Sequence, residues 1–198
     1  MKNTLKLSFS FSNKYNYNLD KEQLKNISTL PKFLDKVLIG IMLGDGGIYR
    51  TSETSNSRFE MSLGTGYKQF AESLGILFKE YMTTSVKTVE VKGKNKVYIN
   101  YRLKTISLPI FNKYHEMFYI FNNEKNKYDK IIPKNISELL DPVVLAYLIM
   151  TDGNYDKSRK RVRIYTNSYT KEEVQNLANA INTNLNIYVG VLHDRKNQ

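Results

Sequence analysis

The sequence predicts an α+β protein made of two pseudo-symmetric half-domains, each in the order helix, two strands, helix, two strands, helix (αββαββα). Two apolar segments support this prediction, because each reads as a short helix that ends in Asp-Gly: Leu38 to Gly46 and Leu145 to Gly153. Alternation of apolar and polar residues, which is typical of strands, follows each helix. The same order of elements therefore starts twice along the 198 residues.

The first half-domain is expected at residues 31–121, after an N-terminal extension at residues 1–30. Pro31 precedes the first apolar helix, and Pro109 falls in the first turn of the last one, where proline is favoured. A Gly-Lys-Asn turn between two alternating runs predicts a hairpin. The expected elements are a helix at 32–44, strands at 47–51 and 58–65, a helix at 67–81, hairpin strands at 88–92 and 96–105, and a helix at 108–121.

A charged connector at residues 122–140 leads to the second half-domain at residues 141–198. Asp141 and Pro142 suit the N-cap and first turn of its apolar helix. The expected elements beyond that helix are a strand at 161–167, a helix at 170–185 that starts with a Thr170–Glu173 capping box, and a strand at 186–192. This half-domain is expected to be incomplete, because it lacks the last strand and the closing helix of the first.

The charge balance indicates a polyanionic partner. A formal net charge of +11 favours nucleic acid over an anionic membrane. No membrane partner is expected, since no apolar run reaches the roughly 18 residues that span a bilayer. The chain has no cysteine and only two histidines, His115 and His193, so thiolate sites are excluded and zinc is disfavoured. Any bound metal should be a hard ion held by oxygen.

The composition also bears on where the protein is made. Residues 1–21 carry neither a signal-peptide core nor a transit-peptide pattern. Asn, Lys, Ile and Tyr are abundant and have A/T-rich codons, as in a fungal mitochondrial genome, although A/T-rich bacteria and viruses fit equally well. We expect a mitochondrial, organelle-encoded protein.

The two Asp residues at the helix ends form the candidate active site. A carboxylate at the C-terminal end of a helix is unfavourable unless a cation compensates for the helix dipole. Packing the helices side by side would bring Asp45 and Asp152 together, and two close carboxylates repel each other without a cation between them. A divalent metal is the expected compensating charge. Asp-Gly is also a common helix end, which would explain either motif alone.

Small residues are expected where the two helices touch. Gly40 and Gly44 lie on one helical face and would let another backbone approach closely. Ala146 and Thr151 are the expected contact residues of the second helix.

Alternate residues of three predicted strands share an outward face rich in basic, aromatic and amide groups. Polar outward faces are usual in antiparallel sheets, but the excess of Arg and Lys favours a surface that contacts base edges and phosphates. The predicted nucleic-acid-binding residues are Arg50, Arg58, Glu60, Ser62, Lys92, Lys94, Lys96, Tyr98, Asn100, Arg102, Lys104, Lys157, Arg159, Lys160, Arg161, Arg163 and Tyr165.

The paired motifs resemble those of single-chain LAGLIDADG homing endonucleases. The resemblance rests on LIGIMLGDG at 38–46, LAYLIMTDG at 145–153, KIIP at 130–133 and YTNSYTKEEV at 165–174. In that family a saddle-shaped antiparallel sheet follows each motif helix and lies in the DNA major groove. The last acidic residue of each motif binds catalytic Mg²⁺.

The resemblance implies that Asp45 and Asp152 bind Mg²⁺, with Mn²⁺ as a substitute, and that the carbonyls of Gly44 and Thr151 add oxygen ligands. It also makes Lys130 a catalytic basic residue, whereas a solvated lysine in a polar connector is the alternative. The implied activity is that of a monomeric, intron-encoded, site-specific endonuclease that makes a staggered break in double-stranded DNA.

Two other functions stay open at the level of sequence. The shortened second half and the basic segments at 21–25 and 125–134 also fit an RNA-binding descendant, either a group I intron maturase or a protein bound to ribosomal RNA. A DNA-binding regulator without cleavage is the third hypothesis, and the two retained aspartates argue against it.

Overall fold

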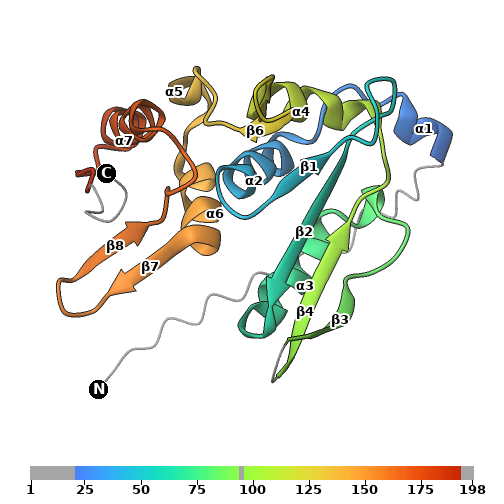
Figure 1. Ribbon diagram of the computed structural model, residues 1–198, viewed down its shortest axis with the longest axis horizontal. Coiled ribbons are helices and arrows are strands. Elements are labelled where there is room, and N and C mark those ends of the chain that lie inside the picture. The colour runs from blue at the N-terminus through green and yellow to red at the C-terminus, as the bar shows by residue number, and fades with distance from the viewer. Residues whose placement is uncertain (1–20, 94–95, 193–198) are drawn as a thin grey trace.

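The computed structural model describes residues 21–93 and 96–192, and Figure 1 traces their elements. Two apolar helices, α2 (Lys32–Leu43) and α6 (Pro142–Asp152), pack side by side at the centre. Asp141 caps α6, because its side chain accepts hydrogen bonds from the backbone N–H groups of Val143 and Val144, as the sequence predicts. The two motif helices therefore form the seam of the molecule.

Gly40 lets the backbones of the two helices approach closely in this seam. A Cβ atom on Gly40 would lie 2.5 Å from the carbonyl oxygen of Val144 and 2.8 Å from the Cβ of Tyr147. Ala146 is exposed to solvent, so its predicted place in the interface is wrong. It lies two positions from Val144, which puts it on the opposite face of α6.

The first motif helix is followed by an antiparallel sheet in the order β1-β2-β4-β3. Its strands are β1 (Gly47–Tyr49), β2 (Arg58–Gly64), β3 (Lys87–Lys92) and β4 (Val97–Lys104). The helix α3 (Lys68–Leu77) lies behind this sheet in Figure 1, flanked by the short 3-10 turns Thr65–Tyr67 and Lys79–Tyr81. The predicted helix at 67–81 is therefore shorter than expected.

The predicted alternation of faces holds for β2 and for one end of β4. Phe59, Met61 and Leu63 of β2 are buried, as are Tyr101 and Leu103 of β4. At the other end of β4, the predicted inward residues Val97 and Ile99 are 59% and 36% exposed. The helices thus cover only part of the sheet.

The segment after β4 differs most from the predicted elements. A 3-10 turn (Pro109–Phe111) and α4 (Asn112–Phe118) replace a helix at 108–121, and the chain then forms an antiparallel hairpin of β5 (Tyr119–Asn122) and β6 (Lys127–Lys130). A short helix, α5 (Ile136–Leu139), follows. The predicted connector is therefore structured.

In the second unit, β7 (Gly153–Asp156) pairs with β8 (Arg161–Ile164), and α7 (Lys171–Leu185) follows. The predicted capping box of α7 is confirmed. The strand predicted at 186–192 is wrong, because α7 ends at Leu185, its C-cap residue Asn186 is left-handed (φ 52°), and no strand forms at 186–192. Within the described residues, α6, β7, β8 and α7 repeat the order of α2, β1, β2 and α3.

One hydrophobic core unites these parts. It includes Leu24, which lies in α1 (Lys21–Lys25), and Leu30, both from the predicted N-terminal extension. The first sheet and the β7–β8 hairpin extend to the same side of α2 and α6, whereas α4, α5 and α7 lie on the other side (Figure 1). None of the helices in the described part of the chain is long and apolar enough to cross a membrane.

Candidate active site at the ends of the motif helices

The C-terminal ends of α2 and α6 bring both candidate aspartates to one place. Asp45 is exposed and follows Gly44, the C-cap residue of α2, while Asp152 is half-buried and ends α6. Gly44 lies directly against the second motif, since a Cβ atom there would overlap Oγ1 of Thr151 and Oδ2 of Asp152. The absence of a side chain at Gly44 therefore lets the two motifs lie this close together.

Asp152 carries its charge in an unfavourable setting. Burial raises the pKa of its carboxyl to about 6, and the nearby Asp45 contributes to the rise, whereas Lys130 opposes it. The two carboxylates thus interact, as expected if the motif helices pack side by side.

Lys130, the last residue of β6, belongs to the same cluster. Its Nζ donates hydrogen bonds to the carbonyl oxygens of Gly44 (2.5 Å) and Gly46 (2.7 Å). Burial lowers its pKa to about 8, although Asp152 and Asp45 favour its charged form. Lys130 is therefore a half-buried part of the aspartate cluster and not a solvated lysine.

The donor set suits a hard cation that keeps much of its water shell. Asp45 and Asp152 supply two carboxylates, and no group of three or more His, Cys, Asp or Glu side chains forms a metal cluster among the described residues. Mg²⁺ is commonly held by one or two carboxylates, with waters and substrate phosphates as the other ligands. The residues present therefore fit such an ion.

Gly44 and Thr151, the two residues whose carbonyls are predicted ligands, make different contacts. The Gly44 carbonyl accepts a hydrogen bond from Lys130, so the lysine ammonium already contacts this oxygen. The Thr151 hydroxyl donates to the carbonyls of Tyr147 and Leu148 within α6, which ties its side chain to its own helix.

Two tyrosines, which the sequence pattern did not single out, hold the turn that carries Asp45. Tyr169 donates its hydroxyl proton to the carbonyl of Leu43 (2.9 Å), and the backbone N–H of Ile48 donates to the hydroxyl of Tyr119 (3.1 Å). Burial raises the pKa of both phenols, so both stay protonated. Their partners lie 126 and 71 positions away along the chain, which no local pattern could reveal.

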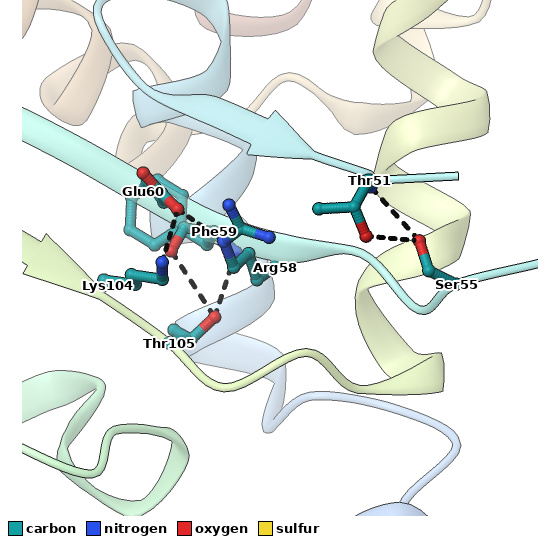
Figure 2. Close-up of polar contacts among 7 residues, drawn as sticks. All are labelled: Thr51, Ser55, Arg58, Phe59, Glu60, Lys104 and Thr105. Carbon is teal, nitrogen blue, oxygen red and sulfur yellow. Dashed lines mark hydrogen bonds and ion pairs between the residues drawn. The ribbon is translucent and has the colours of Figure 1, made fainter. Parts of the chain in front are cut away.

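A groove of about 930 Å³ lies along the polar face of the first sheet, and Asp45 is one of the residues that line it. The predicted binding residues Arg58, Glu60, Ser62, Arg102 and Lys104 also line this groove. Figure 2 shows Arg58 and Lys104 beside Glu60. Arg58 makes a short hydrogen bond to the Glu60 carboxylate, and Lys104 Nζ lies 3.3 Å from it. Burial raises the pKa of Glu60, but these two cations hold it below its ordinary value.

The other predicted binding residues are spread over the two hairpins and one loop. Arg50 donates to the carbonyls of Glu53 and Ser55, so its guanidinium is bound to its own loop. Lys94 lies outside the described residues. Exposed positions are held by Lys92, Lys96, Tyr98, Lys157, Arg159, Lys160 and Tyr165, and half-buried ones by Asn100, Arg161 and Arg163.

Residues 35–198 match the LAGLIDADG DNA endonuclease family, and the chain belongs to this family. Among curated relatives, it is 31% identical over 180 residues to the probable intron-encoded endonuclease 1 of Wickerhamomyces canadensis, covering 87% of this chain and 74% of the relative. It is 28% identical to the cytochrome b mRNA maturase bI2 of Saccharomyces cerevisiae, covering 88% of this chain but only 43% of the maturase. The predicted family is thus confirmed.

A solved structure shows the same fold. The homing endonuclease I-WcaI bound to its DNA recognition sequence matches with a TM-score of 0.76 and 25% identity, covering 88% of this chain and 77% of that one. This match confirms the predicted α+β class and its LAGLIDADG architecture.

Proposed function

We propose that this protein is an intron-encoded, site-specific endonuclease that makes a Mg²⁺-dependent, staggered break in a long double-stranded DNA target. The observation that carries the proposal is the meeting of Asp45, Asp152 and Lys130 at the end of a basic groove. The DNA-bound homing endonuclease I-WcaI, which shares the fold, supports DNA as the partner.

Each residue of the cluster has a distinct task in this proposal. Asp45 and Asp152 would hold the divalent cation, Mg²⁺ or Mn²⁺, which supplies activation of water and stabilisation of charge on the phosphate. The Lys130 ammonium interacts electrostatically with both carboxylates, and a cation at this place would stabilise negative charge that develops on a phosphate. Tyr169 and Tyr119 fix the backbone on either side of Asp45.

Binding would use the elements on the sheet side of the molecule. The groove over the first sheet and the β7–β8 hairpin flank the aspartates, so one monomer could contact both halves of a long site. The relatives are yeast proteins, an intron-encoded endonuclease and a cytochrome b mRNA maturase, which supports the expected mitochondrial location.

Cleavage of an intronless target tests the proposal. We expect double-strand cleavage with Mg²⁺, and loss of cleavage with retained binding in Asp45→Asn and Asp152→Asn. Asp129→Asn is the matched control, because Asp129 lies on β6 near Lys130 but pairs with Lys125 (2.8 Å) outside the cluster. Target that stays intact in Mg²⁺ while fully bound would refute the enzyme and leave the DNA-binding regulator.

An RNA-binding maturase is the second candidate function, and the likeness to the maturase bI2 of Saccharomyces cerevisiae over 88% of this chain favours it. Affinities for the intron RNA and for the intronless DNA, measured at one salt concentration, separate the two roles because salt governs both. Tighter binding to the RNA together with absent cleavage would establish the maturase, or a related role on ribosomal RNA.

A further inference from the structure

Asp156, at the end of β7, gathers three arginines from the β7–β8 hairpin. Its Oδ2 accepts from Arg163 Nη2 (3.1 Å) and Arg159 Nη1 (3.3 Å), and it is ion-paired with Arg161 Nε (3.7 Å). Its other oxygen, Oδ1, accepts from the Ser158 hydroxyl (2.7 Å) and from the backbone N–H of Arg159 (3.2 Å). Only 14% of the Asp156 side chain is exposed.

The two oxygens of the Asp156 carboxylate therefore have different structural roles. One oxygen closes the hairpin turn, and the other is the shared counter-charge of three guanidinium groups that would otherwise repel one another. The hydrogen bonds from Ser158 and Arg159 keep the pKa of Asp156 well below its usual range. The charge that holds the arginines is thus present at neutral pH.

In the first half-domain, the equivalent arginine is contacted by a carboxylate from a different position. Arg58 pairs with Tyr49 across its ladder, as Arg161 pairs with Asp156 in the second. The position that holds an aspartate in the second half thus holds a tyrosine in the first. The arginine there is contacted instead by Glu60, two residues further along the same strand, β2. Asp156 is therefore a feature of the second half alone.

A carboxylate inside a surface that binds a polyanion weakens general attraction to phosphate. It is useful there if it fixes the direction of the guanidinium groups, because an Arg fork recognises the O6 and N7 atoms of guanine only at a defined angle. Arg161 and Arg163 keep side-chain exposures of 39% and 38% while they contact Asp156. Both therefore retain donors for a partner.

We propose that Asp156 is a positioning residue for sequence specificity: it orients the arginines of the β7–β8 hairpin toward base edges in one half of the DNA target. This inference rests on the proposed function and extends it to one residue. Without the carboxylate, the arginines would act as mobile charges that bind phosphate at any sequence.

Selection from a pool of DNA duplexes with a long randomised core tests the role of Asp156. Binding is selected in EDTA at one salt concentration, and bound duplexes are sequenced. Asp156→Asn removes the charge but keeps an oxygen for the turn. We expect it to bind random-sequence duplex more tightly than the wild type, and to lose base preference in one half of the selected site, by about tenfold for each guanine read.

Two matched variants sharpen the experiment. Ser158→Ala removes a turn hydrogen bond but leaves the arginines on Asp156, so it should select the same sequence as the wild type. If Asp156→Asn does not fold, Arg161→Gln with Arg163→Gln replaces it, because the loss of these two forks should erase preference in the same half. The untouched half of the site is the internal control.

The outcomes separate this inference from the proposed function. An unchanged selected sequence with Asp156→Asn, or with the double arginine variant, overturns the inference alone. Equal tightening for the selected and the random duplex also overturns it, because that result reflects charge without orientation. If the wild-type protein selects no sequence, site-specific DNA recognition fails and the inference fails with it.

Discussion

The position of Asp152 is unfavourable for a charged carboxylate. It ends an apolar helix at the negative end of the helix dipole, it is half-buried, and a second carboxylate lies nearby. The charged form of Lys130 is also disfavoured, because burial lowers the pKa of its ammonium group. Groups kept in unfavourable protonation states cluster at functional sites, and this cluster is the strongest sign of one here.

Replacing Asp152 by Asn should therefore stabilise the metal-free protein, and the gain should depend on pH. Below about pH 3 the carboxyl is protonated in both the folded and the unfolded chain, so the two proteins have similar stability. Between pH 4 and 6 the folded state binds the proton more tightly, because the pKa is raised to about 6, and wild-type stability falls as pH rises. Near pH 7 we expect a gain of about 1 kcal/mol for the variant, discounted for solvent exposure.

Urea unfolding in EDTA across this pH range measures the effect. Asp129→Asn is the control, because Lys125 lowers the pKa of Asp129 and its pH dependence should have the opposite sign. Equal stability of Asp152→Asn and the wild type at pH 7 would contradict the expected strain at the site.

At the scale of elements, the close packing of α2 and α6 places the aspartates. Gly40 permits contact with the backbone of Val144, and Gly44 permits contact with Thr151 and Asp152. The helices are apolar enough to be buried, and the glycines decide how near they come. The site is thus a product of helix packing as much as of its own side chains.

A methyl group at Gly40 should push the helices apart. In Gly40→Ala the new Cβ would meet the Val144 carbonyl oxygen at 2.5 Å, and backbone cannot move aside as a flexible side chain can. We expect a loss of about 1–3 kcal/mol in the free energy of unfolding, with weaker cleavage because Asp45 and Asp152 separate.

Urea unfolding and a cleavage assay on the same samples check this expectation. Gly66→Ala is the matched control, since a Cβ there has no atom within 4 Å. If Gly40→Ala were as stable and active as Gly66→Ala, the seam would not set the geometry of the site.

At the scale of the whole molecule, the sheets and the helices are segregated. The first sheet and the β7–β8 hairpin extend to one side of the motif helices (Figure 1), and they carry most of the predicted binding residues. The remaining helices close the other side or cover the back of the sheet. A long polyanion on the sheet side would meet both halves and the aspartates between them.

Salt dependence of DNA binding should therefore depend on which face loses a charge. Arg102→Gln removes an exposed cation that lines the groove, and it should reduce the slope of log Kd against log salt by about one. Lys68→Gln is the control, because Lys68 lies on α3 behind the sheet and is paired with Glu72 (3.8 Å). Equal salt slopes for Arg102→Gln and Lys68→Gln would indicate that nucleic acid does not bind along this groove.

Local signals in the sequence determined those elements whose pattern lies within a few neighbouring residues. The first motif helix was expected at 32–44 and is Lys32–Leu43, since an apolar run between Pro31 and Gly44 is a local pattern. The caps at Asp141 and Thr170 are equally local. The repeat of two such motifs was sufficient to predict the family and the α+β fold.

The tertiary structure alone decided which distant residues meet. Tyr169 reaches Leu43, and Lys130 reaches Gly44, across more than eighty positions of sequence. The same packing exposes Ala146, which sequence placed in the seam. Such contacts depend on how whole elements dock, because side-chain partners are set by three-dimensional packing and periodicity fixes only the face of each element.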